Sequence, residues 1–235
     1  MTNRVILITD AAHFVAPAVA GRLRSGGARV IAADESFADT GDNLKQTTPE
    51  ATVARALALS AGRLDAVVIA GTHPAPKTPA EGLTPETTRP FFEKIAIESL
   101  AYVAAATPAL KAAAAGGGQA AIVFLSSAGP LQGIPGFAAY AAARSAINGA
   151  VKSLALELAP SGISVNACAF NYIQTEAYYP RAWLEDAKKR EKLLARVPMA
   201  RLGDPAEAAE MVALFAEGRA GFATGQVLSM SGGTS

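Results

Sequence analysis

The chain has 235 residues, of which 51% are hydrophobic, and its 21 basic and 20 acidic side chains leave a formal charge of +1. This size and balance predict one globular domain with a large core and disfavour nucleic acid as a partner. One cysteine excludes an internal disulfide, two isolated histidines disfavour a zinc site, and the N-terminal residues lack a signal-peptide pattern, so we expect a metal-free cytoplasmic protein without membrane contact.

Short apolar runs alternate with alanine-rich segments of helical spacing. The chain order predicts strands at residues 5–9, 30–33, 66–70, 122–125, 163–169 and 227–230, and helices that include residues 17–25, 49–61, 91–115 and 206–216. Repeated βα units of this kind are typical of a doubly wound, mostly parallel sheet, a Rossmann-like α/β fold. Ligands of such sheets bind beyond the carboxyl ends of the strands, so functional residues are expected directly after each strand.

A serine, a tyrosine and an arginine form the sharpest candidate site. Ser127 follows the strand predicted at residues 122–125, and Tyr140 and Arg144, four residues apart, share one face of the next helix. A free phenol titrates near ~10, and its use as a base at neutral pH requires about 4 kcal/mol of phenolate stabilisation, which a guanidinium can supply. An ordinary surface pair beside a turn-capping serine is the alternative, and spacing alone does not separate the two.

The thirteen-residue step from Ser127 to Tyr140, followed by a basic residue four positions later, resembles the active site of short-chain dehydrogenases/reductases. The resemblance covers nearly the whole chain, including the closing residues 224–233. In the oxidoreductases of that family the basic residue is a lysine that also holds the nicotinamide ribose. Here it is Arg144, which is the first departure from their pattern.

The loop after the first strand is the second departure. Asp10, Phe14 and Ala16 stand where those oxidoreductases have the three glycines that admit a dinucleotide pyrophosphate. An aspartate repels phosphate, and a phenylalanine is expected to occupy the space of the dinucleotide. Asp34, at the end of the second strand, is the one feature that favours a nucleotide, because an acidic residue there accepts ribose hydroxyls.

Serine, tyrosine and arginine without a glycine loop resemble the halohydrin dehalogenases, the cofactor-independent branch of this superfamily. Residues 13–14, 34–37, 170–173 and 178–180 resemble segments of the same enzymes. The resemblance implies three groups of site residues: a catalytic set of Ser127, Tyr140 and Arg144, a halide site of Phe14, Phe170, Asn171, Tyr172 and Ile173, and a substrate pocket with Ile134, Tyr178 and Tyr179.

The implied activity converts vicinal haloalcohols to epoxides and releases halide and a proton, with no cofactor. Its reverse is epoxide opening by halide, azide, cyanide or nitrite. The resemblance also implies a homotetramer built through the helices at residues 91–115 and 140–158, and residues 174–198 are expected to cover the site within a single domain of residues 1–235. Phe170 replaces a proline of the family and the next segment is shorter, so pocket size and halide preference stay open.

Two other functions remain compatible with these residues. One is an NAD(P)-dependent short-chain oxidoreductase with an aberrant phosphate loop, which Asp34 favours. The other is a non-catalytic scaffold of the same fold that binds small molecules or a partner without turnover.

Overall fold

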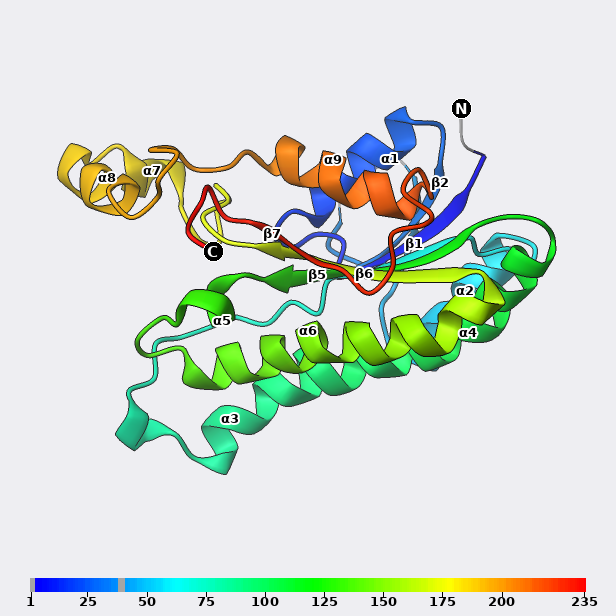
Figure 1. Ribbon diagram of the computed structural model, residues 1–235, viewed down its shortest axis with the longest axis horizontal. Coiled ribbons are helices and arrows are strands. Elements are labelled where there is room, and N and C mark those ends of the chain that lie inside the picture. The colour runs from blue at the N-terminus through cyan, green and yellow to red at the C-terminus, as the bar shows by residue number, and fades with distance from the viewer. Residues whose placement is uncertain (1–2, 38–40) are drawn as a thin grey trace.

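One seven-stranded parallel sheet forms the centre of the molecule (Figure 1). The computed structural model describes residues 3–37 and 41–235. The strands are β1 (Val5–Thr9), β2 (Arg29–Ala33), β3 (Asp42–Leu44), β4 (Ala66–Ile69), β5 (Ala120–Ser127), β6 (Ile163–Phe170) and β7 (Val227–Met230), and they lie in the order β3-β2-β1-β4-β5-β6-β7. The chain order therefore reverses between β1 and β4, which opens a crevice at the carboxyl ends of these strands. The predicted doubly wound α/β fold is confirmed.

Helices cover both faces of this sheet. Figure 1 shows α1 (Ala16–Ser25) and α9 (Pro205–Ala216) on one face and α2 (Pro49–Leu59), α4 (Glu98–Ala115) and α6 (Ala138–Leu158) on the other. The remaining helical segments are short: η1 (Ala80–Gly82), α3 (Pro85–Phe91), η2 (Phe92–Ile97), α5 (Gly129–Gln132), η3 (Ala159–Ser161), α7 (Arg181–Leu184) and α8 (Ala187–Leu194). The last two form an arm that stands beyond the strand ends.

The core lies on both sides of the sheet, because neighbouring residues of each strand point to opposite faces. In β1, Leu7 packs into the cluster under α4 and α6, while Ile6 and Ile8 pack into the cluster under α1 and α9. Every residue of β5 and β6 is buried. Burial on both faces explains why these strands read as continuous apolar runs rather than as alternating patterns.

Three features differ from the sequence prediction. The edge strand β3 was not predicted, because its three residues, Asp-Asn-Leu, lack any apolar run. Strand β5 extends through Ser127, so the serine ends the strand instead of following it. The helix predicted at residues 91–115 is interrupted after Phe91 by the π-helical turn η2, and regular α-helix resumes only at Glu98.

By length and composition alone, the helical run Pro85–Ala115 is long and apolar enough to cross a membrane. It instead packs against α2, α6 and β5. Tyr102, Ala106 and Leu110 are buried on its sheet side, as in the core helix of a layered α/β protein.

Candidate active site

A cavity of about 180 Å³ lies at the carboxyl ends of β5 and β6. All eleven residues that the sequence suggested for a site line it, although they come from segments as distant as Phe14 and Tyr179. Four lining residues were missed, namely Thr72, Ala75, Ser126 and Phe137. Thr72 and Ser126 carried a usable signal, because both lie at strand ends; Ala75 and Phe137 carried none.

Ser127 presents its hydroxyl to the cavity from the last position of β5. Its Oγ accepts a hydrogen bond from the Gly129 N–H at 3.0 Å, which leaves the hydroxyl proton available to an oxygen in the cavity. Asn148 fixes this strand end to α6: its Oδ1 accepts from the Ser126 hydroxyl at 2.6 Å, and its Nδ2 donates to the Ser127 carbonyl at 3.3 Å. Asn148 follows Arg144 by one helical turn, so the face of α6 that carries Tyr140 continues to Asn148.

Arg144 is a buried cation rather than half of a surface pair. It is 6% exposed, and its Nη1 donates to the carbonyls of Leu125 at 2.8 Å and Ala70 at 3.3 Å. Its Nε is buried without a partner, and no carboxylate of the described residues forms an ion pair with it. A buried charge without a counter-ion is costly, and its environment therefore favours an anion nearby.

Tyr140 is the group beside that cation which can become an anion. The Arg144 Cζ lies 5.4 Å from the centroid of the Tyr140 ring, and the Phe91 ring meets the same tyrosine edge-on at 6.3 Å. Tyr178 lines the same cavity as Tyr140. Burial, together with the neighbouring Tyr140, raises the pKa of Tyr178 to about 12. Serine, tyrosine and arginine thus lie together, as the spacing predicted.

Aromatic rings form one wall of the cavity. Phe14 meets Phe170 edge-on at 5.8 Å and Tyr178 at 5.4 Å, while Tyr172 stacks on Tyr179 at 6.2 Å. Phe14 and Tyr172 have positive φ values of 54° and 56°, a backbone region that residues other than glycine rarely adopt. Strain of this kind concentrates at functional sites, where the surrounding structure holds it in place.

The hydrogen-bond donors of the predicted halide-site residues 171–173 are only partly free to contact an anion. The Tyr172 N–H donates to the Asn171 Oδ1 at 3.0 Å, and the Asn171 Nδ2 donates to the Gln132 Oε1 at 2.9 Å. The Tyr172 N–H and one hydrogen of the Asn171 amide are therefore used within the protein. Among the described residues, no acceptor contacts the Ile173 N–H. The Ile173 N–H and the second hydrogen of the Asn171 amide can therefore turn to an anion without breaking these bonds.

Three backbone amides of the loop after β1 already have acceptors within the protein. The N–H of Asp10 donates to the Gln46 Oε1 at 2.7 Å, that of Ala12 to the Asp34 Oδ2 at 3.1 Å, and that of His13 to the Asp10 carbonyl at 3.0 Å. The Asp10 carboxylate, 8% exposed, pairs with Lys94 at 3.0 Å and accepts from the Thr72 N–H at 3.1 Å. These contacts do not fit a dinucleotide, whose phosphates need free donors and no adjacent carboxylate.

Asp34, which favoured a nucleotide, braces two turns. One oxygen accepts from the Ala12 N–H, and the other accepts from the N–H and the hydroxyl of Ser36 at 2.9 and 2.6 Å. Burial opposes ionisation, but the hydrogen bonds from Ser36 and Ala12 prevail and hold the pKa of Asp34 below its ordinary value. Its carboxylate is therefore occupied at the place where a ribose would need it.

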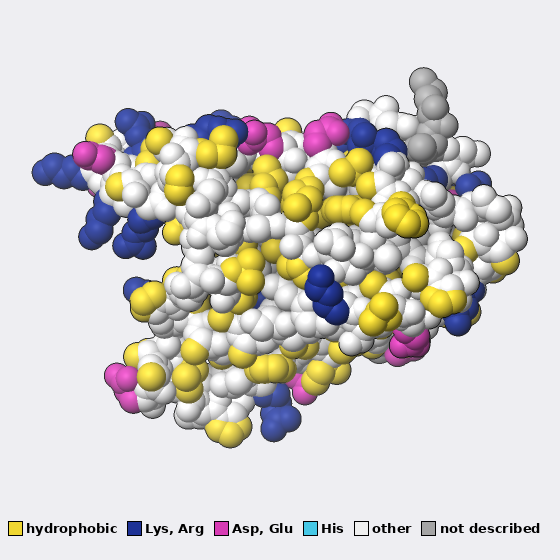
Figure 2. All heavy atoms as spheres, viewed as in Figure 1, with side chains coloured by type: hydrophobic (Ala, Val, Ile, Leu, Met, Phe, Trp, Pro, Cys, Tyr) yellow, Lys and Arg dark blue, Asp and Glu magenta, His cyan; other side chains and the backbone are white. Residues whose placement is uncertain are grey.

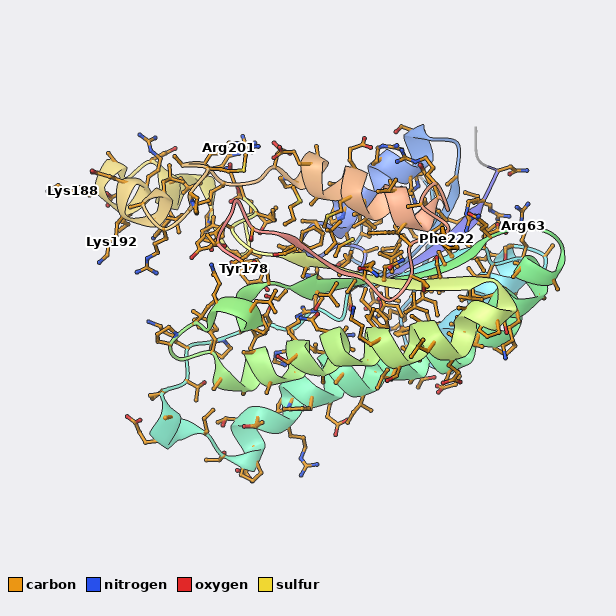
Figure 3. All side chains as sticks on the ribbon, viewed as in Figure 1. Arg63, Tyr178, Lys188, Lys192, Arg201 and Phe222 are labelled. Atoms are coloured by element: carbon orange, nitrogen blue, oxygen red, sulfur yellow. The ribbon has the colours of Figure 1, made fainter. Side chains whose placement is uncertain are left out.

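Phe14 does not fill the space of a dinucleotide completely. A second, open hollow of about 630 Å³ lies across its ring, lined by residues 12–14, 17–18, 174–177, 181 and 204–205. Figure 2 shows the surface notched beneath the arm of α7 and α8, and Figure 3 places Tyr178, which lines the smaller cavity, at the inner end of that notch. The Phe14 side chain thus lies on the border between the two hollows.

Comparison with known proteins places the chain among reductases by sequence. A family model described as enoyl-(acyl carrier protein) reductase matches residues 11–235. A 3-oxoacyl-(acyl-carrier-protein) reductase of Vibrio cholerae is 32% identical over 99% of this chain and 98% of its own. Human dehydrogenase/reductase SDR family member 4 is 28% identical over 100% and 88%. A tropinone reductase homologue of Datura stramonium is 40% identical, but the match covers 54% of this chain and about half, 47%, of that relative.

Comparison with solved structures also finds proteins described as dehalogenases. A protein titled dehalogenation enzyme superposes with a TM-score of 0.92 at 33% identity, covering 100% of this chain and 99% of the other. A halohydrin dehalogenase bound to ethyl (2S)-oxiran-2-ylacetate gives 0.89 at 24% identity over 97% and 96%, a likeness of fold. A 3-ketoacyl-(acyl-carrier-protein) reductase of Brucella melitensis complexed with NADH gives 0.84 at 26% identity over 98% of each chain.

Proposed function

This chain belongs to the short-chain dehydrogenase/reductase superfamily, and we propose that within it the enzyme is a cofactor-independent halohydrin dehalogenase. The observation that carries the proposal is a Ser127, Tyr140 and Arg144 set lining one cavity beside the loop after β1, where side chains of other segments accept the N–H groups of Asp10 and Ala12. A reductase needs that loop open. A reaction whose base, nucleophile and leaving group require no nucleotide does not need an open phosphate loop.

The proposed reaction begins with a proton transfer. Ser127 donates a hydrogen bond to the substrate hydroxyl, and the Tyr140 phenolate, stabilised by Arg144, removes its proton. The alkoxide oxygen then forms a bond to the adjacent carbon while the carbon–halogen bond breaks, and the halide leaves with the electron pair. The products are an epoxide, a halide and one proton, which Tyr140 passes to solvent. Because nucleophile and leaving group belong to one molecule, the protein mainly selects the anti-periplanar conformer.

The departing halide is proposed to rest against the aromatic wall. The edges of Phe14 and Phe170 offer a polarisable apolar surface, and the Ile173 N–H supplies a donor without a competing acceptor among the described residues. A single amide and ring edges suit a weakly hydrated anion, which must leave again after each turnover. The cavity of about 180 Å³ favours small haloalcohols over extended ones.

A reductase is the second candidate, favoured by the 32% identity to the Vibrio cholerae reductase. The open hollow of about 630 Å³ beside Phe14 also leaves room for part of a nucleotide. Against it stand the amides of Asp10 and Ala12, which already have acceptors, and the carboxylates of Asp10, Asp34 and Glu35, which lie on the rim of a neighbouring hollow that shares His13 with the first. Together with Glu98 they outnumber Lys94, the single lysine on that rim, and disfavour phosphate.

One assay separates the candidates. Purified protein is offered a bromohydrin without nucleotide, and bromide and proton release are followed together, with Tyr140→Phe as the matched control. Equal release of both ions by the wild type alone is the expected result. Calorimetric titration with NAD and NADP runs in parallel. Nucleotide binding in the low micromolar range together with no bromide release would replace the dehalogenase by the reductase. The absence of both signals would indicate a non-catalytic scaffold.

A further inference from the structure

An exposed glutamine joins the halide loop, residues 170–173, to two other segments of the chain. Gln132 is the last residue of α5, and Figure 1 shows α5 and the C-terminal end of the chain at the same end of the sheet. The Gln132 Oε1 accepts a hydrogen bond from the Asn171 Nδ2 at 2.9 Å, and the Gln132 Nε2 donates to the Thr234 carbonyl. The proposed function gives Gln132 no role.

The backbone of the halide loop is fixed by a neighbouring segment. The Gly203 N–H donates to the Tyr172 carbonyl at 2.9 Å, and the Gln174 N–H donates to the Gly203 carbonyl at 2.9 Å. These two bonds form a parallel bridge that holds Ile173 beside Gly203. The bridge does not fix the side chain of Asn171, whose amide has a carbonyl oxygen on one side and two N–H donors on the other.

Backbone groups at both ends determine which way the two side-chain amides face. The Tyr172 N–H can only donate, so the Asn171 atom 3.0 Å from it is Oδ1, and the Asn171 Nδ2 faces Gln132. The Thr234 carbonyl can only accept, so the Gln132 atom that contacts it is Nε2, and the Gln132 Oε1 faces Asn171. The four groups thus form one chain of hydrogen bonds with a single donor-to-acceptor sense. The second hydrogen of the Asn171 Nδ2 is left for the cavity, which Asn171 lines.

We infer that Gln132 is a positioning residue for the departing halide: it holds the Asn171 amide so that an N–H hydrogen, and not the carbonyl oxygen, faces the anion. The inference rests on the proposed function, which supplies the anion. A halide accepts hydrogen bonds and cannot donate them, so an amide turned the other way would set its oxygen against the halide. Held by Gln132, the Asn171 amide adds a second donor to the Ile173 N–H.

The preceding residue of α5, Leu131, provides a matched control. Its side chain is exposed and has no polar group that could reach the halide loop. Methionine is about as long as glutamine but has neither an amide N–H nor a carbonyl, so Gln132→Met removes both bonds and keeps the bulk of the side chain. Leu131→Met puts the same side chain one position earlier on the same short helix. Because both positions are exposed, neither variant should unfold the protein.

The test is competitive inhibition of bromohydrin turnover by bromide, measured as a double-mutant cycle. Gln132→Met should raise the inhibition constant for bromide about threefold, because the amide loses a hydrogen bond that orients it and can turn its oxygen to the anion. The KM for the bromohydrin should stay the same, since Ser127 and Tyr140 keep their contacts. In the Asn171→Ala background, Gln132→Met should have no further effect on the inhibition constant.

Four results of this cycle would overturn the inference. The inhibition constant could stay unchanged in Gln132→Met, or it could rise equally in Leu131→Met. It could also rise in step with KM, which would indicate a general distortion of the cavity. Finally, it could rise as much in the Asn171→Ala background as in the wild type, which would show that Gln132 does not act through Asn171.

A second measurement needs no turnover. The side-chain amide of Asn171 is observed by NMR in isotope-labelled protein and assigned by its absence in Asn171→Ala. Without bromide, its resonances should move in Gln132→Met and stay in place in Leu131→Met. On addition of bromide at constant ionic strength, they should shift in the wild type and shift less in Gln132→Met.

The two measurements separate the inference from the proposed function. If the wild type releases no bromide, the proposed function fails, while the bromide-free spectra still decide whether Gln132 holds the Asn171 amide. Asn171 resonances that are the same in the wild type and in Gln132→Met overturn the inference, even if bromide is released.

Discussion

Replacing Arg144 with methionine should make the protein more stable and nearly inactive at once. The guanidinium is 6% exposed and has two carbonyl acceptors but no ion pair with a described carboxylate, so no partner charge is left behind when it is removed. Desolvation of a buried ion costs several kcal/mol, which the two hydrogen bonds offset only in part. We expect the free energy of unfolding to rise by about 1–3 kcal/mol, a shift in Tm of roughly 2–12 °C for a chain of this size.

The loss of activity has a separate magnitude. A unit charge 5.4 Å from the Tyr140 ring contributes about 3 kcal/mol to the phenolate at an effective dielectric constant of ~20, so bromide release at neutral pH should fall roughly 100-fold. Because the lost cation favoured the anion, activity should recover as pH rises. Urea unfolding and halide release are measured on the same preparation.

Arg144→Lys is the control for this experiment. It keeps the charge buried, so it should not gain stability, and it loses the planar fork that reaches both carbonyls, so it should also be impaired. If Arg144→Met is destabilised by more than about 2 kcal/mol, the arginine is a structural brace and not a strained functional cation.

Three further predictions follow from single contacts of the site. Phe14→Ala should weaken competitive inhibition by bromide severalfold, because it removes the ring packed on Phe170 and Tyr178. Asn171→Ala should change this inhibition less, because the Asn171 amide already bonds to Gln132 and Tyr172. Equal inhibition constants in both variants and the wild type would place the halide elsewhere. Asp10→Ala should cost about 2 kcal/mol in urea unfolding through the lost Lys94 pair, and Asp10→Asn, which suits the same left-handed backbone, should cost less. Asn148→Ala should lower kcat more than it raises KM by releasing the end of β5, and an unchanged kcat would show that Ser127 needs no such support.

The strands were predictable where burial on both faces leaves a continuous apolar signal, as in β1, β5 and β6. The strand β3 was not, because an edge strand of three residues with polar Asp42 and Asn43 is held by its neighbour β2 and not by its own composition. Site residues were predictable for a related reason. They follow strand ends or share one helix face, and local spacing fixes both relations.

Contacts between distant segments could not be predicted in the same way. Asp10 was interpreted as a residue that repels phosphate, but its buried carboxylate also joins Lys94 on η2, Gln46 after β3 and the N–H of Thr72 after β4. Each of these pairs depends on which loops the sheet order brings together. The internal hydrogen bonds of Asn171 likewise depend on Gln132, which lies 39 residues away in the chain.

The occupied amides after β1 and the buried Arg144 have a common explanation: in the proposed enzyme, protein groups take the place of a bound dinucleotide. In a site that holds a dinucleotide, bound phosphates and the nicotinamide ribose occupy the donors at the strand ends. Here side-chain carboxylates and amides of the protein, among them those of Asp10 and Asp34, occupy several of them. The base must then be stabilised by protein groups alone. The buried Arg144 beside the Tyr140 ring can meet that need, because its guanidinium has carbonyl acceptors but no ion pair with a described carboxylate.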